Sequence, residues 1–217
     1  MTQTGIFKGR VQIPYAYGRY GWTRGGGKTW HGGIDLVGLD DPTIYMPYYT
    51  AADGTQKAIK GTVTRARKVD RSTGDPTWEW GWYVCVQLDA GQTPDEVNFL
   101  YFCHCKELLV KVGQQVKTGD ILAIMGQTGN AAGGYDHCHL EARATATGTG
   151  LDPTAYSGTA NAAGSYGSAG DAPQGESRLQ IITIGPVSQG DADAILAAAR
   201  ARGLDRQGLY TSRWAEG

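Results

Sequence analysis

The chain has 217 residues, with 20 lysines and arginines against 21 acidic side chains and a formal net charge of -1. This balance excludes the strongly basic surface by which proteins bind nucleic acids or anionic membranes. No run approaches the ~18 apolar residues of a membrane-spanning helix, so stable membrane insertion is not expected. With 33 glycines and 41% hydrophobic residues, the composition favours a turn-rich β protein over disorder.

The first two thirds of the chain read as an all-β domain. From Val11 to about Tyr156, short β-rich runs alternate with turns of glycine, proline, asparagine and aspartate. Strands are predicted at 61–66, 82–88, 98–104, 121–125 and 137–143. No convincing long helix interrupts them. We therefore predict a mainly β fold, an antiparallel β-sheet domain with a duplicated hybrid motif, over residues 1–156.

The remainder of the chain predicts a linker and a small appendage. Residues 157–177 are rich in Gly, Ser and Ala, which is typical of a flexible linker. Residues 178–217 predict a strand, a helix and a short strand, at Leu179–Ile184, about Asp191–Arg202 and Leu209–Thr211. About forty residues without disulfides rarely fold alone. We expect this C-terminal module to dock, to dimerise or to bind cell wall; a packing appendage with no ligand is an equally good interpretation.

All four histidines fall in three short patterns, His31-Gly-Gly-Ile-Asp35, Tyr101-Phe-Cys-His104 and His137-Cys-His139. In an extended strand alternate side chains share a face, so His137 and His139 point the same way. The two glycines between His31 and Asp35 make a helix costly there. His31, Asp35 and His139 then supply two imidazoles and one carboxylate. That is the ligand set of a catalytic zinc site that leaves a fourth position for water.

Four cysteines, Cys85, Cys103, Cys105 and Cys138, are interleaved with these histidines. If the histidines face a metal, strand alternation predicts that Cys103, Cys105 and Cys138 face the other side of the sheet, where small apolar thiols pack well. We predict buried free thiols. Disulfides and a cysteine-bearing metal site are the alternatives, but the spacings do not match a structural CxxC pattern.

Further patterns complete a family resemblance. They are a Val-x-x-Gly-x-x-Val-x-x-Gly run at Val110–Gly119, the Met-Gly-Gln-Thr-Gly-Asn run at Met125–Asn130, and a closing Leu151–Tyr156. Together with the histidine patterns, in this order over residues 11–156, they resemble the zinc metalloendopeptidases of family M23. That family includes lysostaphin-like and LytM-like peptidoglycan hydrolases.

The resemblance implies a role for each histidine. It places one zinc ion per chain on His31, Asp35 and His139. His104 and His137 would line the site without binding the metal and would handle protons and charge. We assign His137 as the general base and His104 as the partner that stabilises or relays, although the sequence does not fix this order.

Some positions depart from the family pattern or are left open by it. Asp136 precedes the histidine pair where a small residue or proline is common, and residues 70–80 look like an insertion. An upstream tyrosine often assists in this family, and either Tyr17 or Tyr20 is a candidate. The Gly126–Gly134 loop, just before the last histidine pair, is expected to form one wall of the cleft.

Aromatic residues 78–83 line either a substrate groove or the core. Alternation from Trp80 through Trp82 and Val84 is equally typical of a core strand face, and we favour the core for Trp82 and Val84.

The predicted function is that of a bacteriolytic zinc endopeptidase, which hydrolyses peptide bonds of bacterial peptidoglycan, in the cross-bridge or the stem peptide, through a metal-activated water. One alternative is a catalytically inactive M23-like structural or wall-binding protein, such as a phage tail component. Another is a lipoyl or biotin carrier, because the Val110–Gly119 run also resembles the motif of those barrels. A carrier needs a lysine at a hairpin tip and has no use for four histidines.

The N-terminus predicts where the protein is made. Residues Met1–Lys8 lack the apolar core of a signal peptide. We expect synthesis in the cytoplasm and action on the bacterial cell wall, as for a phage endolysin released at lysis or a lysin carried in a virion. The alternatives are a bacterial enzyme exported by another route and a chain whose signal has been removed.

Overall fold

A computed structural model of the chain describes residues 1–167, 192–193 and 195. The chain divides into two units, Met1–Pro173 and Gln174–Gly217, and the predicted site lies in the first. The strands predicted at 179–184 and 209–211 lie outside the described residues. Of the helix predicted at 191–202, only Ala192, Asp193 and Ile195 are described, and they are helical. No helix among the described residues has the length and apolar character needed to cross a membrane.

The described part of the chain is built from short strands. Their bounds are β1 Val11–Ile13, β2 Gly21–Arg24, β3 Thr29–His31, β4 Ile34–Gly38, β5 Thr43–Tyr45, β6 Tyr48–Thr50, β7 Gln56–Ala58, β8 Lys60–Lys68, β9 Trp82–Leu88, β10 Phe99–Cys105, β11 Glu107–Leu108, β12 Gln115–Lys117, β13 Ile121–Ile124, β14 Cys138–Arg143, β15 Gly150–Leu151 and β16 Gly164–Tyr166. The one α-helix described in the first unit is α1, Thr154–Ser157, and single 3₁₀ turns lie at Ala16–Gly18, Arg71–Thr73, Trp78–Trp80 and Gly129–Ala131.

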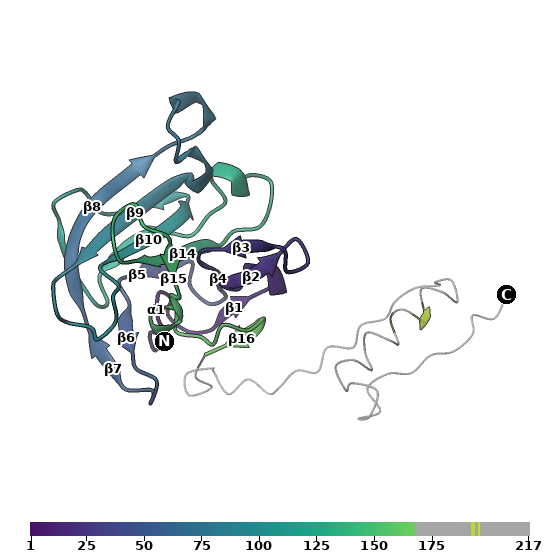
Figure 1. Cartoon of the computed structure of the whole chain (residues 1–217), viewed down its shortest axis with the longest axis horizontal. Helices are drawn as coiled ribbons and strands as arrows, with labels where there is room; N and C mark the ends of the chain where they lie inside the picture. The colour runs from purple at the N-terminus through teal and green to yellow at the C-terminus, as the bar shows by residue number, and fades with distance from the viewer. Residues whose placement is uncertain (168–191, 194, 196–217) are drawn as a thin grey trace. The chain divides into compact units, whose positions relative to one another are not determined.

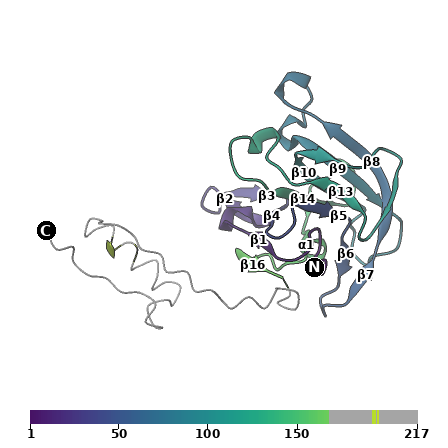
Figure 2. The same ribbon diagram turned by 180° about the vertical axis from the view of Figure 1, so that it is seen from behind.

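A nine-stranded sheet organises the domain. Its strands follow the order β12-β8-β9-β10-β14-β4-β1-β16, with β15 paired to β14, and a smaller sheet has the order β11-β13-β5. Every pair is antiparallel, and Figures 1 and 2 show the long strands β8, β9 and β10 side by side. The predicted mainly β, antiparallel class is confirmed. All five strands predicted from the sequence are present, as β8, β9, β10, β13 and β14.

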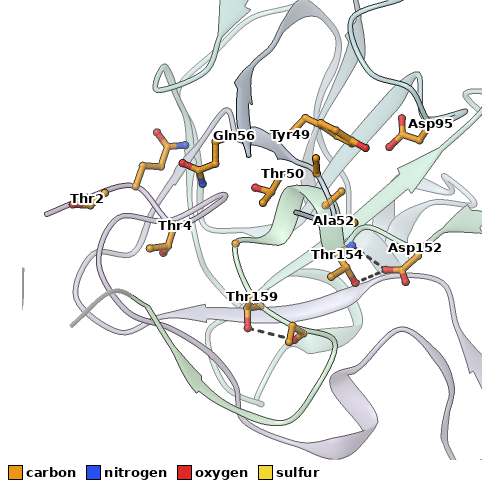
Figure 3. A pocket seen from close by; sticks show the side chains of 15 residues that line it. Thr2, Thr4, Tyr49, Thr50, Ala52, Gln56, Asp95, Asp152, Thr154 and Thr159 are labelled. Carbon is orange, nitrogen blue, oxygen red and sulfur yellow. Dashed lines mark hydrogen bonds between the residues drawn. The ribbon is translucent and has the colours of Figure 1, made fainter. Parts of the chain in front are cut away.

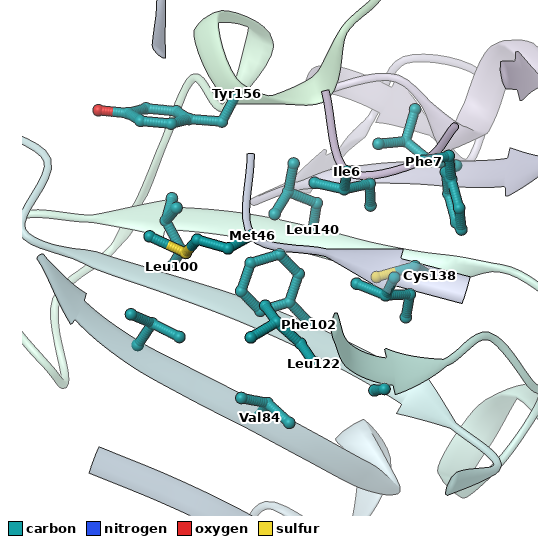
Figure 4. Close-up of a cluster of buried hydrophobic side chains, with 14 of the residues drawn as sticks. Ile6, Phe7, Met46, Val84, Leu100, Phe102, Leu122, Cys138, Leu140 and Tyr156 are labelled. Carbon is teal, nitrogen blue, oxygen red and sulfur yellow. The ribbon is translucent and has the colours of Figure 1, made fainter. Parts of the chain in front are cut away.

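Alternation along the central strands separates the two faces of the large sheet. Leu100 and Phe102 of β10 and Leu140 of β14 point to one face, where they are fully buried with Ile44 and Leu122 of the smaller sheet. Figure 4 shows Leu100, Phe102, Leu122 and Leu140 packed together. The intervening residues of the same strands point to the opposite face. The main hydrophobic core thus packs against one face of the sheet, and the other face carries a smaller buried cluster around Tyr83 and Tyr101 together with polar groups.

Phe102 tests this division of faces. It has no exposed surface and lies in the middle of the core cluster, so Phe102→Ala should lower the free energy of unfolding by about 3–5 kcal/mol. Chemical denaturation followed by fluorescence measures the change. Val112, which is 62% exposed, gives the matched control: Val112→Ala should stay within about 0.5 kcal/mol of the native chain. A loss below about 1 kcal/mol for Phe102→Ala would contradict the packing.

The linker prediction is wrong for part of its described length. Gly164–Tyr166 forms β16, which pairs with β1 through Val11 opposite Tyr166, and Tyr166 packs against the core. A Gly- and Ser-rich composition lowers strand propensity. The unpaired backbone groups along the edge of a sheet, here β1, nevertheless form hydrogen bonds with an extended segment whatever its side chains. Composition alone therefore did not show that residues 164–166 pair with β1. Residues 168–177 of the predicted linker lie outside the described residues.

Candidate metal centre

Two neighbouring strands place Asp35 and His139 side by side. Asp35 of β4 lies directly opposite His139 of β14 in the sheet register. Their neighbours Ile34 and Leu140 point into the hydrophobic core, so alternation sends Asp35 and His139 together to the opposite face. His31 joins them from the end of β3, in the hairpin of β2 and β3 that precedes β4 (Figure 1).

Three potential ligand atoms converge at this point. The Nδ1 atom of His139 lies 2.9 Å from Oδ1 of Asp35 and 3.0 Å from Nε2 of His31, and the His31 and Asp35 atoms are 3.3 Å apart. His31 and Asp35 are each 2% exposed and His139 is 8% exposed. Two imidazole nitrogens and one carboxylate oxygen are the donors of a catalytic zinc site. The residues present therefore fit a single divalent metal ion.

Hydrogen bonds fix the protonation of His31. Its Nδ1 lies 2.8 Å from the carbonyl oxygen of Arg19. A carbonyl only accepts, so Nδ1 carries the ring proton and Nε2 presents its lone pair to the site.

Both ring nitrogens of His139 face carboxylates. Nδ1 contacts Asp35, and Nε2 lies 3.0 Å from Oε1 of Glu141. Burial alone would lower the pKa of His139, but the two carboxylates outweigh it and raise this pKa to about 9. Burial likewise opposes the charge of Asp35, yet its close contacts with the His139 and His31 rings hold its pKa well below the usual range. A metal ion bound here takes the place of the Nδ1 proton of His139.

Glu141 orients His139 through the ring nitrogen that does not face Asp35. The sequence prediction missed this role, although the His-x-Glu spacing on a strand indicated it. Arg143 in turn holds Glu141 through an Nε–Oε2 contact of 2.6 Å. We expect Glu141→Gln to weaken zinc binding by about 10–100-fold, because the outer carboxylate fixes the tautomer and orientation of the ligand. Competition with a chelator measures the affinity, and exposed Glu107 supplies the control Glu107→Gln. Equal affinity in the two variants would show that Glu141 does not position His139.

His104 reaches the site through an irregularity of β10. Cys103 still pairs with His139 in register, but the pairing with β9 shifts between Phe102 and Cys105. His104 has φ of 65°, the only positive value at a non-glycine residue in the part of the chain that the structure describes. Regular alternation would send this side chain into the core. The left-handed residue turns it onto the face of His139 instead, and it is 6% exposed there.

This irregularity corrects one prediction about the cysteines. Cys103 lies on the same face as His139, packed with Tyr83, Cys85 and Tyr101, and not on the reverse face as expected. Cys105 and Cys138 do face the core. The prediction assumed that β10 alternates regularly, so that Cys103 and Cys105 both lie opposite to His104. The bulge at His104 breaks this alternation and leaves Cys103 on the same face as His104 and His139. The prediction of buried free thiols is confirmed for all four cysteines.

The strained backbone at His104 gives a test of its own. Alanine keeps the penalty of a left-handed residue, whereas glycine does not. His104→Gly should therefore unfold at a higher denaturant concentration than His104→Ala, by about 1 kcal/mol in free energy, while both lack the imidazole. A more stable alanine variant would contradict the strain at this position.

His104 and His137 present unprotonated nitrogens to the same space. The Nδ1 atom of His104 donates to the carbonyl of Thr128 at 2.9 Å, and that of His137 donates to the carbonyl of Tyr135 at 3.0 Å. Burial, reinforced by the neighbouring histidines, lowers the pKa of His104 to about 3, and burial also lowers the pKa of His137. Both rings are thus neutral near pH 7 with Nε2 as an acceptor. The Nε2 atom of His137 lies 3.8 Å from Oδ1 of Asp35.

Tyrosines flank His137. The Tyr135 ring lies 4.7 Å from the His137 ring and 5.4 Å from the Tyr15 ring, which stacks on Tyr17. Burial, Tyr15 and the charge of Asp35 raise the pKa of Tyr17. The hydroxyl of Tyr20 instead donates to the carbonyl of Gly150. Of the two upstream tyrosines, the structure thus brings Tyr17 to the site; Tyr135 was not recognised in the sequence.

A hollow of about 780 Å³ adjoins the site. Trp78, Trp82 and Arg71 line one side, and Thr128, whose carbonyl holds His104, lies on the other with its loop. Part of the predicted Gly126–Gly134 loop thus lines this hollow; its place as a wall of the catalytic cleft stays a prediction. Val84 is in the core as predicted, while Trp82 both contacts the core and lines this hollow.

A second hollow, of about 860 Å³, is built differently. Figure 3 shows it lined by hydroxyl, amide and carboxylate groups, including Thr50, Gln56 and Asp152. Neither hollow has Asp35 or any of the four histidines in its lining, but only the first includes Thr128, which contacts His104.

Comparison with known proteins places these residues in a family. The pattern of Peptidase family M23 matches residues 49–153. This span contains His104, His137 and His139, whereas His31 and Asp35 precede it. A search of curated proteins found no match.

Several solved structures are similar to this chain. The catalytic domain of the antimicrobial peptidase lysostaphin from Staphylococcus simulans is 22% identical, with 64% of this chain and 86% of that chain covered and a TM-score of 0.43. The catalytic domain of a mutant of the prophage-encoded M23 protein EnpA from Enterococcus faecalis is 21% identical, with coverages of 62% and 85% and a TM-score of 0.43. LytU is 24% identical, with coverages of 66% and 82% and a TM-score of 0.43.

Proposed function

Because this chain belongs to peptidase family M23, we propose that it is a zinc-dependent endopeptidase that hydrolyses peptide bonds of bacterial peptidoglycan. The observation that carries the proposal is the buried group of His31, Asp35 and His139 with two neutral histidines beside it. A structural zinc site closes its coordination with four protein ligands, whereas three ligands leave a position open for water or substrate.

Each residue has a defined task in this proposal. His31, Asp35 and His139 hold one zinc ion through Nε2, Oδ1 and Nδ1. When bound, zinc lowers the pKa of a water toward ~7 and polarises the amide carbonyl. The Nε2 atom of His137 would accept the proton of the attacking water and return a proton to the leaving amine, while His104 would stabilise or relay. Their Nδ1 contacts with Thr128 and Tyr135 keep each ring in the tautomer that this transfer needs.

The surroundings of the site support a peptide substrate. Thr128 lines this hollow and its backbone carbonyl accepts the hydrogen bond of His104, so a peptide bound in the hollow would lie one residue away from a proton-transfer group. Trp78 and Trp82 line it, each with a cation, Arg71 or Lys68, over one ring face, and their remaining apolar surface suits the side chains of a peptide.

Removal and return of the metal test the proposal. We expect the metal-free chain to leave purified cell walls intact and one equivalent of zinc to restore the loss of turbidity. Magnesium serves as the control ion, because it prefers octahedral oxygen ligands and this group offers two nitrogens. Stoichiometric zinc without wall cleavage would reject the enzyme and favour the inactive, wall-binding relative.

A further inference from the structure

Arg24 reaches into the ligand set from the end of β2. Its Nη2 atom donates to Nε2 of His31 at 2.8 Å and to Oδ2 of Asp35 at 3.0 Å. The pairing of β2 with β3 shifts between Trp22 and Arg24, so Arg24 does not follow the regular alternation of its strand. A cationic side chain therefore contacts two of the three residues that would hold the metal, one of them, His31, through its ligand atom.

The contact with His31 excludes a metal ion from the same atom. The ring proton of His31 is on Nδ1, where the Arg19 carbonyl accepts it, so Nε2 has a single lone pair. That lone pair accepts a hydrogen bond from Arg24, and it is also the pair that a metal would take. The two cannot be bound at once.

The negative charge of Asp35 favours the position of Arg24. The side chain of Asp35 is 3% exposed, and a buried carboxylate needs a cationic or hydrogen-bonding partner. The guanidinium of Arg24 supplies such a partner at Oδ2 of Asp35. A divalent ion held by Asp35 would supply positive charge in its place.

We propose that Arg24 is an internal stand-in for the metal: its guanidinium occupies the ligand set of the metal-free chain, keeps His31 and Asp35 in place, and is displaced when zinc binds. The inference rests on the proposed function only for the choice of zinc. It concerns metal binding and not wall cleavage, so an experiment can reject this inference without rejecting the proposed function, and the reverse.

The hairpin lets the guanidinium leave. The side chain of Arg24 is 41% exposed, and it is followed by Gly25–Gly27, all with positive φ. Its Nε is buried without a hydrogen-bond partner among the described residues, which makes this seat less favourable than a fully paired one. Displacement of the guanidinium therefore breaks its hydrogen bonds to His31 and Asp35, and it allows the unpaired Nε–H to form a hydrogen bond with water.

Two measurements on Arg24→Ala should change in opposite directions. Because an internal competitor lowers apparent affinity, its removal should tighten zinc binding by about 10-fold or more in chelator competition. When both chains are free of metal, Arg24→Ala should unfold at a lower denaturant concentration than the native chain, since Asp35 loses its partner. With saturating zinc, the two chains should unfold at the same denaturant concentration. Arg19→Ala is the matched control, because it removes the same charge just before β2, and the hydrogen bond of its side chain goes to the Ala16 carbonyl and not to a ligand residue.

Two further readouts separate displacement from simple charge repulsion. Arg24→Lys keeps the charge but not the reach of the guanidinium, so it should also bind zinc more tightly than the native chain, whereas repulsion alone predicts native affinity. By NMR, the guanidinium protons of native Arg24 should exchange slowly with water without metal and rapidly after one equivalent of zinc. Unchanged or weaker zinc binding in Arg24→Ala, or protons that remain protected in the zinc-loaded chain, would overturn the proposal.

Discussion

Asp35→Asn should abolish both stoichiometric zinc and wall cleavage. Oδ1 of Asp35 lies within 3.3 Å of the ligand nitrogens of both His31 and His139, so it is the common centre of the three donors. An amide at this place removes the negative charge that a divalent ion needs in a buried site. The loss of zinc affinity should therefore exceed the about 10–100-fold that an outer partner costs.

Elemental analysis after dialysis against buffered zinc measures this loss. Asp89→Asn is the control, because Asp89 forms an exposed ion pair with Lys60 and changes the net charge equally. The control should keep one zinc ion per chain and full wall cleavage. A full complement of zinc in Asp35→Asn would mean that the ion binds elsewhere.

His137→Ala and His104→Ala should have the second largest effect, with the opposite pattern in metal content. Neither residue is among the three ligands, so both variants should keep one zinc ion per chain. Each removes a neutral Nε2 acceptor from the open side of the site, and loss of such a group typically lowers the rate by about 10²–10⁴-fold.

Parallel assays of zinc content and of turbidity loss on purified walls check this pattern. Loss of zinc on His137→Ala would make His137 a ligand and overturn its role in proton transfer. Retention of native activity in either variant would assign the transfer to the other histidine alone. Each variant must first be shown to be folded, because burial of both rings makes them part of the packing.

Period-two alternation predicted much of this molecule. It placed His137 and His139 in one strand, and it identified β8, β9, β10, β13 and β14, because these strands have one apolar face and short turns between them. It also supported the set of His31, Asp35 and His139, whose ligand atoms the fold brings within 4.8 Å of one another. Pairing of β4 with β14 is a long-range property that no local pattern contains.

The remaining features depend on local backbone geometry. Nothing in Phe102-Cys-His-Cys105 signals a left-handed residue, since no glycine marks the bulge, and the face of Cys103 was predicted wrongly for that reason. Arg24 was not recognised either, because its approach to the ligands depends on an irregular hairpin beside three glycines. Strand β16 was missed because backbone pairing can order a chain whose composition is typical of a linker.

Mass spectrometry of the fragments released from purified peptidoglycan by the zinc-loaded chain tests the central claim most directly. Hydrolysis of a peptide bond adds one water and creates a new amino terminus. We predict fragments with new amino termini in the cross-bridge or stem peptide and no new reducing sugar ends, and none from Asp35→Asn. Cleavage confined to the glycan strand, or equal fragments from the zinc-loaded chain and Asp35→Asn, would contradict it.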